Sequence, residues 1–497
     1  MLLRNSIWNL GGSAIPSIAA LVTLPILIGA LGVEGFGIVT LIGSVIGYFA
    51  VLDINLTQGA IKYLAENHAA GDRERFAETF WFGAMFYGML GAVGAIAIYL
   101  SSGWLVGHFF EVSEGMRAAT VAAFQVGAVG FALTQVQNYL LGVPQALQRY
   151  DRSAQSEAMF GVLVNVASAL AALAGAGVTG VIVVRIAISF LNVLYLAWLI
   201  RGFRLGLGFR WPRREVRGAL TSFSAYAYLS KLASTMHQHA DKLVVGAIAG
   251  PIAVTFYTVP ATLSSRILGL TFRLSQVIYP RASALAALDR MEELRAIYLG
   301  AMRHITYINL VALGVIVLAG EEFLRRWVGE EFVAQGYPVL VLMTLALLAD
   351  SLTNIPSMVN DALGHPHITG KFALVRGVLG VGLVYLGVKA AGIEGAAAGH
   401  LLASLVMGAL FLWFVHGRSV PVSLREMLRQ GIGPSLAVGS IIFAILLPLK
   451  WLVPEGLLGT LAMVALAGIS LLLAGLAFIV SVDERAALRA AARRIVS

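Results

Sequence analysis

The sequence predicts an all-α membrane protein that crosses the bilayer many times. Of its 497 residues, 59% are hydrophobic and 12% are charged, and the mean hydropathy is +0.84. A soluble globular chain has roughly 25% charged residues, so this composition leaves too little polar surface to cover soluble domains. The apolar residues also gather in runs of about 20, which is the length of a transmembrane helix. The third observation is that the basic residues concentrate in alternate connections between these runs.

The composition and motifs exclude several other classes of protein. The chain contains no cysteine, which rules out thiol chemistry and cysteine-ligated metals. His237 and His239 form a His-x-His pair, which is a weak metal signal, and we expect no metal site. The sequence has no Walker motif, so we expect no ATP-driven step within this chain. The longest outer connections carry no dense set of acids and histidines, so we do not expect an enzyme.

We expect fourteen transmembrane helices, because fourteen runs are long and apolar enough to span a bilayer. Gly-rich turns alone separate the fifth run from the sixth and the eleventh from the twelfth. If either pair formed one helix, every later connection would change sides. The runs cover residues 7–30, 37–61, 79–100, 117–141, 155–175, 181–200, 218–247, 254–279, 299–319, 337–361, 371–389, 394–416, 432–450 and 457–481.

The basic residues indicate the orientation of these helices. With the N-terminus in the cytoplasm, the cytoplasmic segments hold 23 of the 35 basic residues, and the outer segments hold five. This bias follows the positive-inside rule and predicts that both termini are cytoplasmic. It also accounts for most of the formal net charge of +9, so we expect no nucleic-acid partner. The six arginines from Arg201 to Arg217 either orient their loop or contact anionic lipid headgroups.

The chain contains an internal repeat. When its second half is aligned on its first half, Gly29-Ala30-Leu31 falls on Gly246-Ala247-Ile248, and Asp72-Arg73 falls on Asp289-Arg290. The register of this alignment drifts only slightly along the chain. An even number of helices in each half keeps both halves in the same orientation, with a cavity expected between them.

We therefore expect two pseudo-symmetric six-helix lobes and two additional C-terminal helices. The expected segments are an N-terminal lobe at 1–200, an Arg-rich cytoplasmic loop at 201–217, a C-terminal lobe at 218–417, and helices 13 and 14 with a basic tail at 418–497.

Seven basic residues fall inside the predicted helices, where each costs roughly 2.5–3.5 kcal/mol at the helix centre. Lys231 and Arg266 lie near mid-depth, and Arg273 is about two turns from Arg266. Lys242 lies on the same helical stripe as Lys231. A cation-lined cavity suits an anionic substrate such as a phosphate or pyrophosphate. The alternative is that these cations pair with internal acids, and for Arg185, Arg303 and Arg376 it is that the side chains snorkel to the interface.

Few acidic residues fall inside the predicted helices, and three of them are candidates for coupling to a proton or sodium ion: Asp350, Asp241 and Asp53. Asp350 is the strongest candidate, because it begins a polar stripe that continues through Asn354, Ser357 and Asp361 at helical spacing. The alternative is a salt bridge, in which Asp350 or Asp241 neutralises one of the buried cations.

Several short motifs occur at characteristic places along the chain. They are Trp8-Asn9-Leu10-x-Gly12, Pro25, Leu31-Gly32-x-Glu34-x-Phe36-Gly37, Asp53-x-Asn55-Leu56, Lys62-Tyr63-x-Ala65-Glu66, Asp241-Lys242-Leu243 through Tyr257, and Tyr279-Pro280. These motifs resemble those of the bacterial polysaccharide flippases, the O-antigen or Wzx-like branch of the multidrug/oligosaccharidyl-lipid/polysaccharide (MOP) exporter superfamily. The resemblance extends over essentially the whole chain and departs at Asn55 and Thr255, where the family usually has glycine.

The resemblance implies a MATE-like fold and transport of an undecaprenyl-pyrophosphate-linked oligosaccharide to the outer leaflet of the bacterial inner membrane. It also implies alternating access driven by a proton or sodium gradient, without another cofactor. On this hypothesis Lys231, Arg266 and Arg273 hold the pyrophosphate, assisted by Lys242, and Lys62 contacts it at the inner gate. Membrane lipid, glycan polymerases and glycosyltransferases are the candidate partners.

Three alternatives remain open on the sequence alone. A multidrug or cation antiporter of the same superfamily would depend on carboxylates more than on cations. A lipid II flippase resembles the chain less, because such proteins carry basic residues inside the first helix and here only Arg4 precedes it. A scaffold for glycan assembly would tolerate changes of interior charges but fail when loop residues such as Arg213 and Arg214 are replaced.

Overall fold

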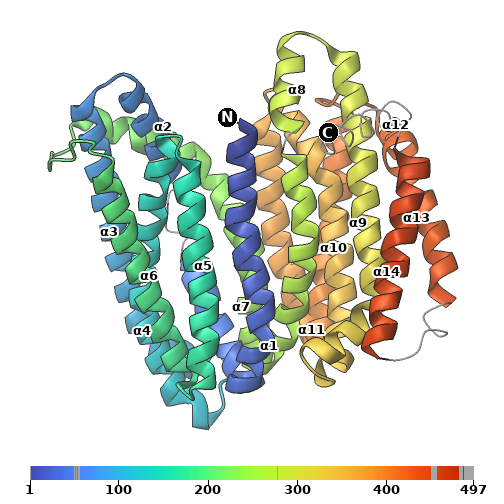
Figure 1. Ribbon diagram of the computed structural model, residues 1–497, viewed down its shortest axis with the longest axis horizontal. Coiled ribbons are helices and arrows are strands. Elements are labelled where there is room, and N and C mark those ends of the chain that lie inside the picture. The colour runs from blue at the N-terminus through green and yellow to red at the C-terminus, as the bar shows by residue number, and fades with distance from the viewer. Residues whose placement is uncertain are drawn as a thin grey trace, which may run out of the picture. The chain divides into compact units, whose positions relative to one another are not determined.

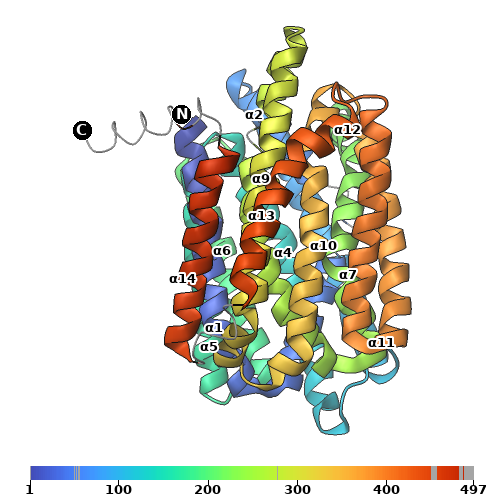
Figure 2. The same ribbon diagram turned by 90° about the vertical axis from the view of Figure 1, so that its right-hand side faces the viewer.

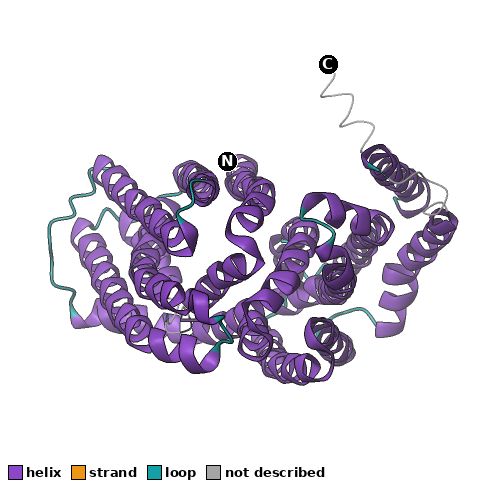
Figure 3. Ribbon diagram, turned by 90° about the horizontal axis from the view of Figure 1, so that it is seen from below, coloured by secondary structure: helices purple, strands orange, loops and turns teal. Residues whose placement is uncertain are grey.

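The computed structural model describes residues 2–49, 51, 53, 56–276, 278–448, 456–480 and 485. All regular structure within these ranges is helical (Figure 3). For some helical residues only the backbone is described, namely 2–13, 219, 221–227, 229–231, 233–234, 237–238, 267, 270, 273–274 and 457. The chain forms two compact units, residues 1–255 and residues 256–497.

The first unit contains six complete helices and the start of a seventh. They are α1 (Leu2–Phe49), α2 (Leu56–Ala69), α3 (Arg73–Trp104) with its π-helical extension η2 (Leu105–Phe109), α4 (Glu114–Ala146), α5 (Tyr150–Leu173), α6 (Gly177–Gly202) and the beginning of α7 (Arg214–Ser275). Within this unit α1 packs on α5, α3 packs on α4, and α4 packs on α6 (Figure 1).

The second unit follows the same order of long and short helices. It contains the end of α7, α8 (Ile278–Ala287), α9 (Met291–Trp327), α10 (Glu331–Ala362), α11 (Pro366–His416), α12 (Leu424–Glu426) with η3 (Met427–Ile432), α13 (Gly433–Leu446), and α14 (Leu457–Ala474) with η5 (Gly475–Ile479). Here α10 packs between α9 and α11, and both α13 and α14 lie against α9 (Figure 2).

Eleven helical runs in the described residues are long and apolar enough to cross a membrane. The protein is therefore a multi-pass membrane protein. Three of the runs are not continuous, because non-helical backbone interrupts α1 at Gly32, α7 at Gly250 and α11 at Ala391 and Gly392. The sequence predicted connecting loops at these three places. The chain instead re-enters a helix at once, since a glycine adopts φ values of 73°, 76° and 58° that strain other residues.

The predicted turn between the fifth and sixth runs is present as a separate connection. α5 ends at Leu173 and α6 begins at Gly177, with both Gly175 and Gly177 at positive φ. These two runs are therefore two helices, as the sequence predicted.

The two units repeat the same series of helix boundaries. The break in α1 at Gly32 corresponds to the break in α7 at Gly250. The starts of α3, α4 and α5 correspond, in the same order, to the starts of α9, α10 and α11. Gly177, where α6 begins, corresponds to the break at Gly392. The spacing between corresponding positions shortens only slightly along the chain, so the sequence repeat is also a repeat of helix boundaries, with the same small drift in register.

A close helix contact in the first unit forms where α1 and α7 resume after their breaks. A Cβ atom on Gly37 would lie 1.9 Å from the backbone oxygen of Pro251, so only glycine fits there. Thr255 donates its hydroxyl to the backbone oxygen of Val33 at 2.7 Å and extends the same contact. Small residues allow this close approach, which stabilises helix packing in a membrane.

We expect Gly37→Ala to destabilise the protein by about 1–3 kcal/mol, because the added methyl group overpacks the contact with Pro251. Gly43→Ala is the matched control on the same helix, since nothing lies within 4 Å of a Cβ there. The measurement is the fraction of each purified variant that stays monodisperse after heating in detergent. Equal thermal stability of the two variants would show that the contact does not hold α1 and α7 together.

Candidate functional site

A charged pair lies deep inside the second unit. Arg376 on α11 donates Nη2 to Oδ2 of Asp350 on α10 at 2.6 Å, and the same nitrogen reaches Oγ of Ser404 at 2.9 Å. The Asp350 and Arg376 side chains are each only 21% exposed. Because Arg376 precedes the break in α11 and Ser404 follows it, the guanidinium joins both segments of α11 to α10.

The position of this pair along the helices explains why it forms. Asp350 lies twelve residues before the end of α10, and Arg376 lies ten residues after the start of α11. The two helices are joined by a short turn, so residues equidistant from it meet at the same depth, about 15–18 Å from the helix ends. Arg376 does not snorkel, and the salt-bridge alternative for Asp350 is the arrangement observed.

A second polar network in the first unit surrounds Asp53, which lies in the connection between α1 and α2 and not inside a helix, where the predicted run 37–61 placed it. Asp53 is 6% exposed and accepts a hydrogen bond from the hydroxyl of Tyr87 at 2.8 Å. The backbone N–H of Thr57 donates to the same hydroxyl oxygen at 2.8 Å. The Tyr87 ring stacks on Tyr139 with centroids 5.4 Å apart, and Tyr139 donates to the backbone oxygen of Phe80 at 2.7 Å. Asp53 is thus held directly by Tyr87 on α3, and through the Tyr87 hydroxyl it is linked to Thr57 on α2.

The predicted basic residues of the first unit lie in contrasting surroundings. Lys62 on α2 is exposed, lies 3.8 Å from Glu66, and covers the ring of Tyr63. Lys242 is half-buried, and its backbone N–H donates to Oδ1 of the buried Asp241 at 2.8 Å. Lys62 therefore lies at the surface of its unit, whereas Lys242 lies next to a carboxylate.

The three predicted pyrophosphate ligands are described to different extents. Arg266 on α7 is exposed on the second unit, so it is not buried within the packing of that unit. The side chains of Lys231 and Arg273 lie outside the described residues. The structure therefore does not bring these three side chains together or separate them, and the pyrophosphate site remains a prediction.

Arg185 is a cation inside α6 that has no carboxylate partner among the described residues. Its Nε donates to Oγ of Ser168 on α5 at 3.1 Å, and Ser168 is fully buried. Arg185 lies eight residues after the start of α6, about 12 Å from the helix end. A second polar pair, Ser156 and Asn192, is joined at 2.8 Å between the same two helices, more than three turns away along α5. Both pairs therefore connect α5 to α6.

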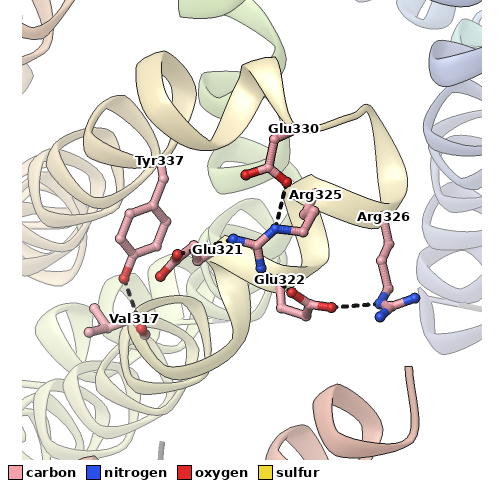
Figure 4. Close-up of polar contacts among 7 residues, drawn as sticks. All are labelled: Val317, Glu321, Glu322, Arg325, Arg326, Glu330 and Tyr337. Atoms are coloured by element: carbon pink, nitrogen blue, oxygen red, sulfur yellow. Dashed lines mark hydrogen bonds and ion pairs between the residues drawn. The ribbon is translucent and has the colours of Figure 1, made fainter. Parts of the chain in front are cut away.

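The basic residues at one end of α9 are, by contrast, neutralised by acids. Arg325 donates Nε to Glu330 at 2.7 Å and also bonds Glu322 and Glu321 (Figure 4). Arg326 donates to Glu322 at 2.7 Å. The cluster lies where α9 turns into α10, so these arginines clamp the turn and are not available to bind an anion.

Sequence reasoning missed the neutral partners of the charged residues. Tyr87, Ser168 and Ser404 hold Asp53, Arg185 and Arg376 respectively. The pairing of Asp350 with Arg376 could have been predicted from the sequence, because the two residues are nearly equidistant from the turn between α10 and α11. No group of three or more potential metal ligands occurs in the described part of the chain.

Known proteins resemble the chain in sequence and in fold. Residues 2–286 match the family described as polysaccharide biosynthesis protein. A Shigella flexneri protein provisionally named an O-antigen transporter is 24% identical, over 85% of this chain and 99% of the relative. A Haloferax volcanii protein provisionally named the flippase AglR is 22% identical, over 85% of this chain and 83% of the relative.

Solved structures resemble the chain in fold. A multidrug resistance MATE family transporter of the MOP superfamily, in an inward-facing conformation, superposes with a TM-score of 0.65 at 17% identity. The match covers 85% of this chain and 99% of that structure. A MOP superfamily transporter from Pyrococcus furiosus, described as having a binding pocket of reverse polarity, matches with a TM-score of 0.55 at 16% identity, over 86% of this chain and 95% of that structure.

We expect Asp350→Asn to destabilise the protein by about 2–3 kcal/mol, below the ~3–5 kcal/mol of a fully buried pair because both side chains keep some exposure. The substitution leaves the charge of Arg376 without its carboxylate. The double variant Asp350→Asn/Arg376→Gln should regain part of the loss, because neither charge then remains. Together with the single variant Arg376→Gln, these proteins form a double-mutant cycle. Thermal unfolding of each protein in detergent gives the coupling energy between Asp350 and Arg376.

The control for this cycle is Glu66→Gln, which removes an exposed pair with Lys62 and should change stability by less than about 1 kcal/mol. Additive effects of Asp350→Asn and Arg376→Gln would contradict a direct ion pair.

Proposed function

The chain belongs to the polysaccharide biosynthesis protein family, and on this premise we propose that it flips an undecaprenyl-pyrophosphate-linked oligosaccharide repeat unit. The lipid-linked glycan moves from the cytoplasmic to the outer leaflet of the bacterial inner membrane. The observation that carries the proposal is the family match, which extends from residue 2 to residue 286. The relatives named as a flippase and an O-antigen transporter, together with the MATE-type fold, support transport and not an enzymatic reaction.

The topology that we propose has fourteen transmembrane helices and cytoplasmic termini. Each of the three interrupted runs crosses the membrane twice, with the glycine break at the turn. The 23-to-5 distribution of basic residues supports this orientation. The recurring helix boundaries support two six-helix lobes followed by α13 and α14. In this topology the Arg-rich segment 201–217 and the turn between α10 and α11 face the cytoplasm.

The site that we propose for the pyrophosphate consists of Lys231, Arg266 and Arg273, with Lys242 nearby and Lys62 at the cytoplasmic entrance. A pyrophosphate has several charged oxygens, and guanidinium groups bind such oxygens in a bidentate manner. The exposure of Arg266 on its unit supports a role in contacting a ligand. Arg325 and Arg326, at the end of α9 that turns into α10, are unsuited to this role because they already pair with glutamates.

The coupling residue that we propose is Asp350, and Asp241 and Asp53 are weaker candidates. Asp350 and a substrate anion are alternative partners for Arg376. Binding of a proton or sodium ion to Asp350 weakens its hold on Arg376, so the guanidinium then favours another anion or a different arrangement of α11. Asp53 is held by the hydroxyl of Tyr87, which favours a fixed structural role.

The experiment that tests the function is native mass spectrometry of protein purified from a host that makes an undecaprenyl-linked glycan. We expect the wild type to carry a polyprenyl-pyrophosphate species and Arg266→Ala/Arg273→Ala to lose it, because two cationic ligands are gone. Arg425→Ala/Arg429→Ala is the matched control, since these two arginines are exposed on the same unit, outside the proposed site.

The outcomes of this experiment separate the function from the site. Lipid retained equally by all three proteins would keep the function and reject the proposed ligands. Absence of any such lipid from the wild type would contradict the proposal and favour the multidrug antiporter, for which dye efflux is the next measurement.

We expect Asp350→Asn to reduce surface glycan by about tenfold or more in a host whose own flippase gene is deleted, because a lost contact of ~1.4 kcal/mol in the rate-limiting step has that effect. Asp151→Asn is the control, since Asp151 pairs with Arg149 at the start of α5. The amount of each protein in the membrane is measured in parallel. Full export by Asp350→Asn at equal protein level would exclude Asp350 from coupling.

A further inference from the structure

The connection between α6 and α7 is an ordered segment that packs on the first unit. From Phe203 to Gly208 its side chains alternate between half-buried and exposed. Phe203, Leu205 and Leu207 pack against the core formed around α2, α3 and α4. Arg204 and two glycines occupy the outward positions between them. The segment, visible as the green loop next to α3 in Figure 1, is therefore laid along the unit with one apolar edge inward.

Polar contacts fix the segment at its second half. Trp81 on α3 donates its ring N–H to the backbone oxygens of Leu207 and Gly208, at 3.3 and 3.1 Å. The Trp81 ring also meets Phe209 edge to face, with centroids 5.3 Å apart.

Two of the six arginines serve the same purpose. Arg210 pairs with Glu74 at 2.9 Å, and Arg213 pairs with the buried Glu78 at 3.0 Å. The backbone N–H of Arg213 donates to Glu78 as well. These carboxylates on α3 neutralise Arg210 and Arg213, so the two side chains anchor the segment and contribute little to its outward charge.

What remains outward on the segment and on the adjoining ends of α6 and α7 is both basic and aromatic. The side chains of Arg201, Arg204 and Arg214 are exposed and have no ion-pair or hydrogen-bond partner among the described residues. Phe209 and Trp211 are 63% and 68% exposed. Aromatic rings that are left this exposed next to arginines are typical of the membrane–water interface, where the ring enters the headgroup region and the cation meets lipid phosphate.

We propose that this segment is a docking surface for the anionic phosphate headgroups of the cytoplasmic leaflet. Arg201, Arg204 and Arg214 bind the headgroups, and Phe209 and Trp211 insert next to them. The proposal rests on the cytoplasmic orientation given above but not on the transported molecule. Charge complementarity and the two exposed rings favour a lipid surface over a soluble acidic protein, which would not require the aromatic residues to be so exposed.

The test is hydrogen–deuterium exchange of the full-length protein in two kinds of nanodisc. One contains phosphatidylcholine alone, and the other contains phosphatidylcholine mixed with phosphatidylglycerol. We expect amides of segment 203–213 to exchange up to about fivefold more slowly in the anionic nanodisc than in the nanodisc of phosphatidylcholine alone. The reason is that each arginine near an anionic surface favours the bound state by about that factor. High salt should remove the difference in the wild-type protein, since it screens these contacts.

The variants are Arg201→Gln/Arg204→Gln/Arg214→Gln and the control Arg281→Gln/Arg425→Gln/Arg429→Gln, whose arginines are exposed on the other unit. The first should lose the lipid dependence of exchange, and the second should keep it. Identical exchange of the wild type in both nanodiscs would overturn the proposal. Equal protection by inorganic phosphate without anionic lipid would overturn it too, because the ligand would then be a free anion and not a membrane surface.

A failure of this test is distinguishable from a failure of the proposed function. Co-purification of the polyprenyl-pyrophosphate species does not depend on segment 203–213. The wild-type salt and lipid series also requires no substitution, so it tests the proposal even if the triple variant folds poorly.

Discussion

Compensation of charge inside apolar helices is the constraint on which the structure depends. A carboxylate or guanidinium in the hydrocarbon region is stable only when another group of the protein satisfies it. Asp350 and Arg376 satisfy each other, and Ser404 completes the contact from the far segment of α11. Asp53, buried in the connection between α1 and α2, accepts a hydrogen bond from the Tyr87 hydroxyl, and Arg185 on α6 donates to the Ser168 hydroxyl. These contacts join helices that the apolar packing alone would allow to slide.

The glycine breaks complement this constraint. Gly32, Gly250 and Gly392 allow three long helical runs to change direction without a loop, which keeps the intervening backbone groups close to hydrogen-bonding partners. Two of the polar contacts involve these breaks, since Arg376 binds a serine beyond the α11 break and Thr255 reaches the backbone just after the α1 break. A pair that spans two helical segments can be exchanged for another pair when one segment moves, which is the type of element that an alternating-access transporter requires.

The sequence predicts the helical class, most of the helix boundaries and the repeat, because these follow from apolar length, helical periodicity and charge bias. It places loops where the chain has only glycine breaks, since composition does not distinguish a short loop from a single residue at positive φ. For the site, it identifies the charged residues that need explaining. From the sequence, a side chain of Arg376 that snorkels to the interface is as plausible as one with an internal partner, because the predicted helix begins at residue 371. In the structure α11 begins at Pro366, which places the Arg376 guanidinium about a turn further from the helix end. Neutral partners such as Ser168 and Tyr87 escape prediction, because hydroxyl groups are common in helices and only the packing selects which of them face a charge.

The most direct measurement of the central claim is flipping in proteoliposomes. A labelled undecaprenyl-pyrophosphate oligosaccharide is incorporated with the purified protein, and an impermeant enzyme that cleaves the glycan reports the fraction of lipid in the accessible leaflet. The account predicts that the wild-type protein transfers the protected lipid to the accessible leaflet when a proton or sodium gradient is imposed, and that empty liposomes do not. An accessible fraction that stays equal to that of empty liposomes, with correctly folded protein and under both gradients, would contradict it.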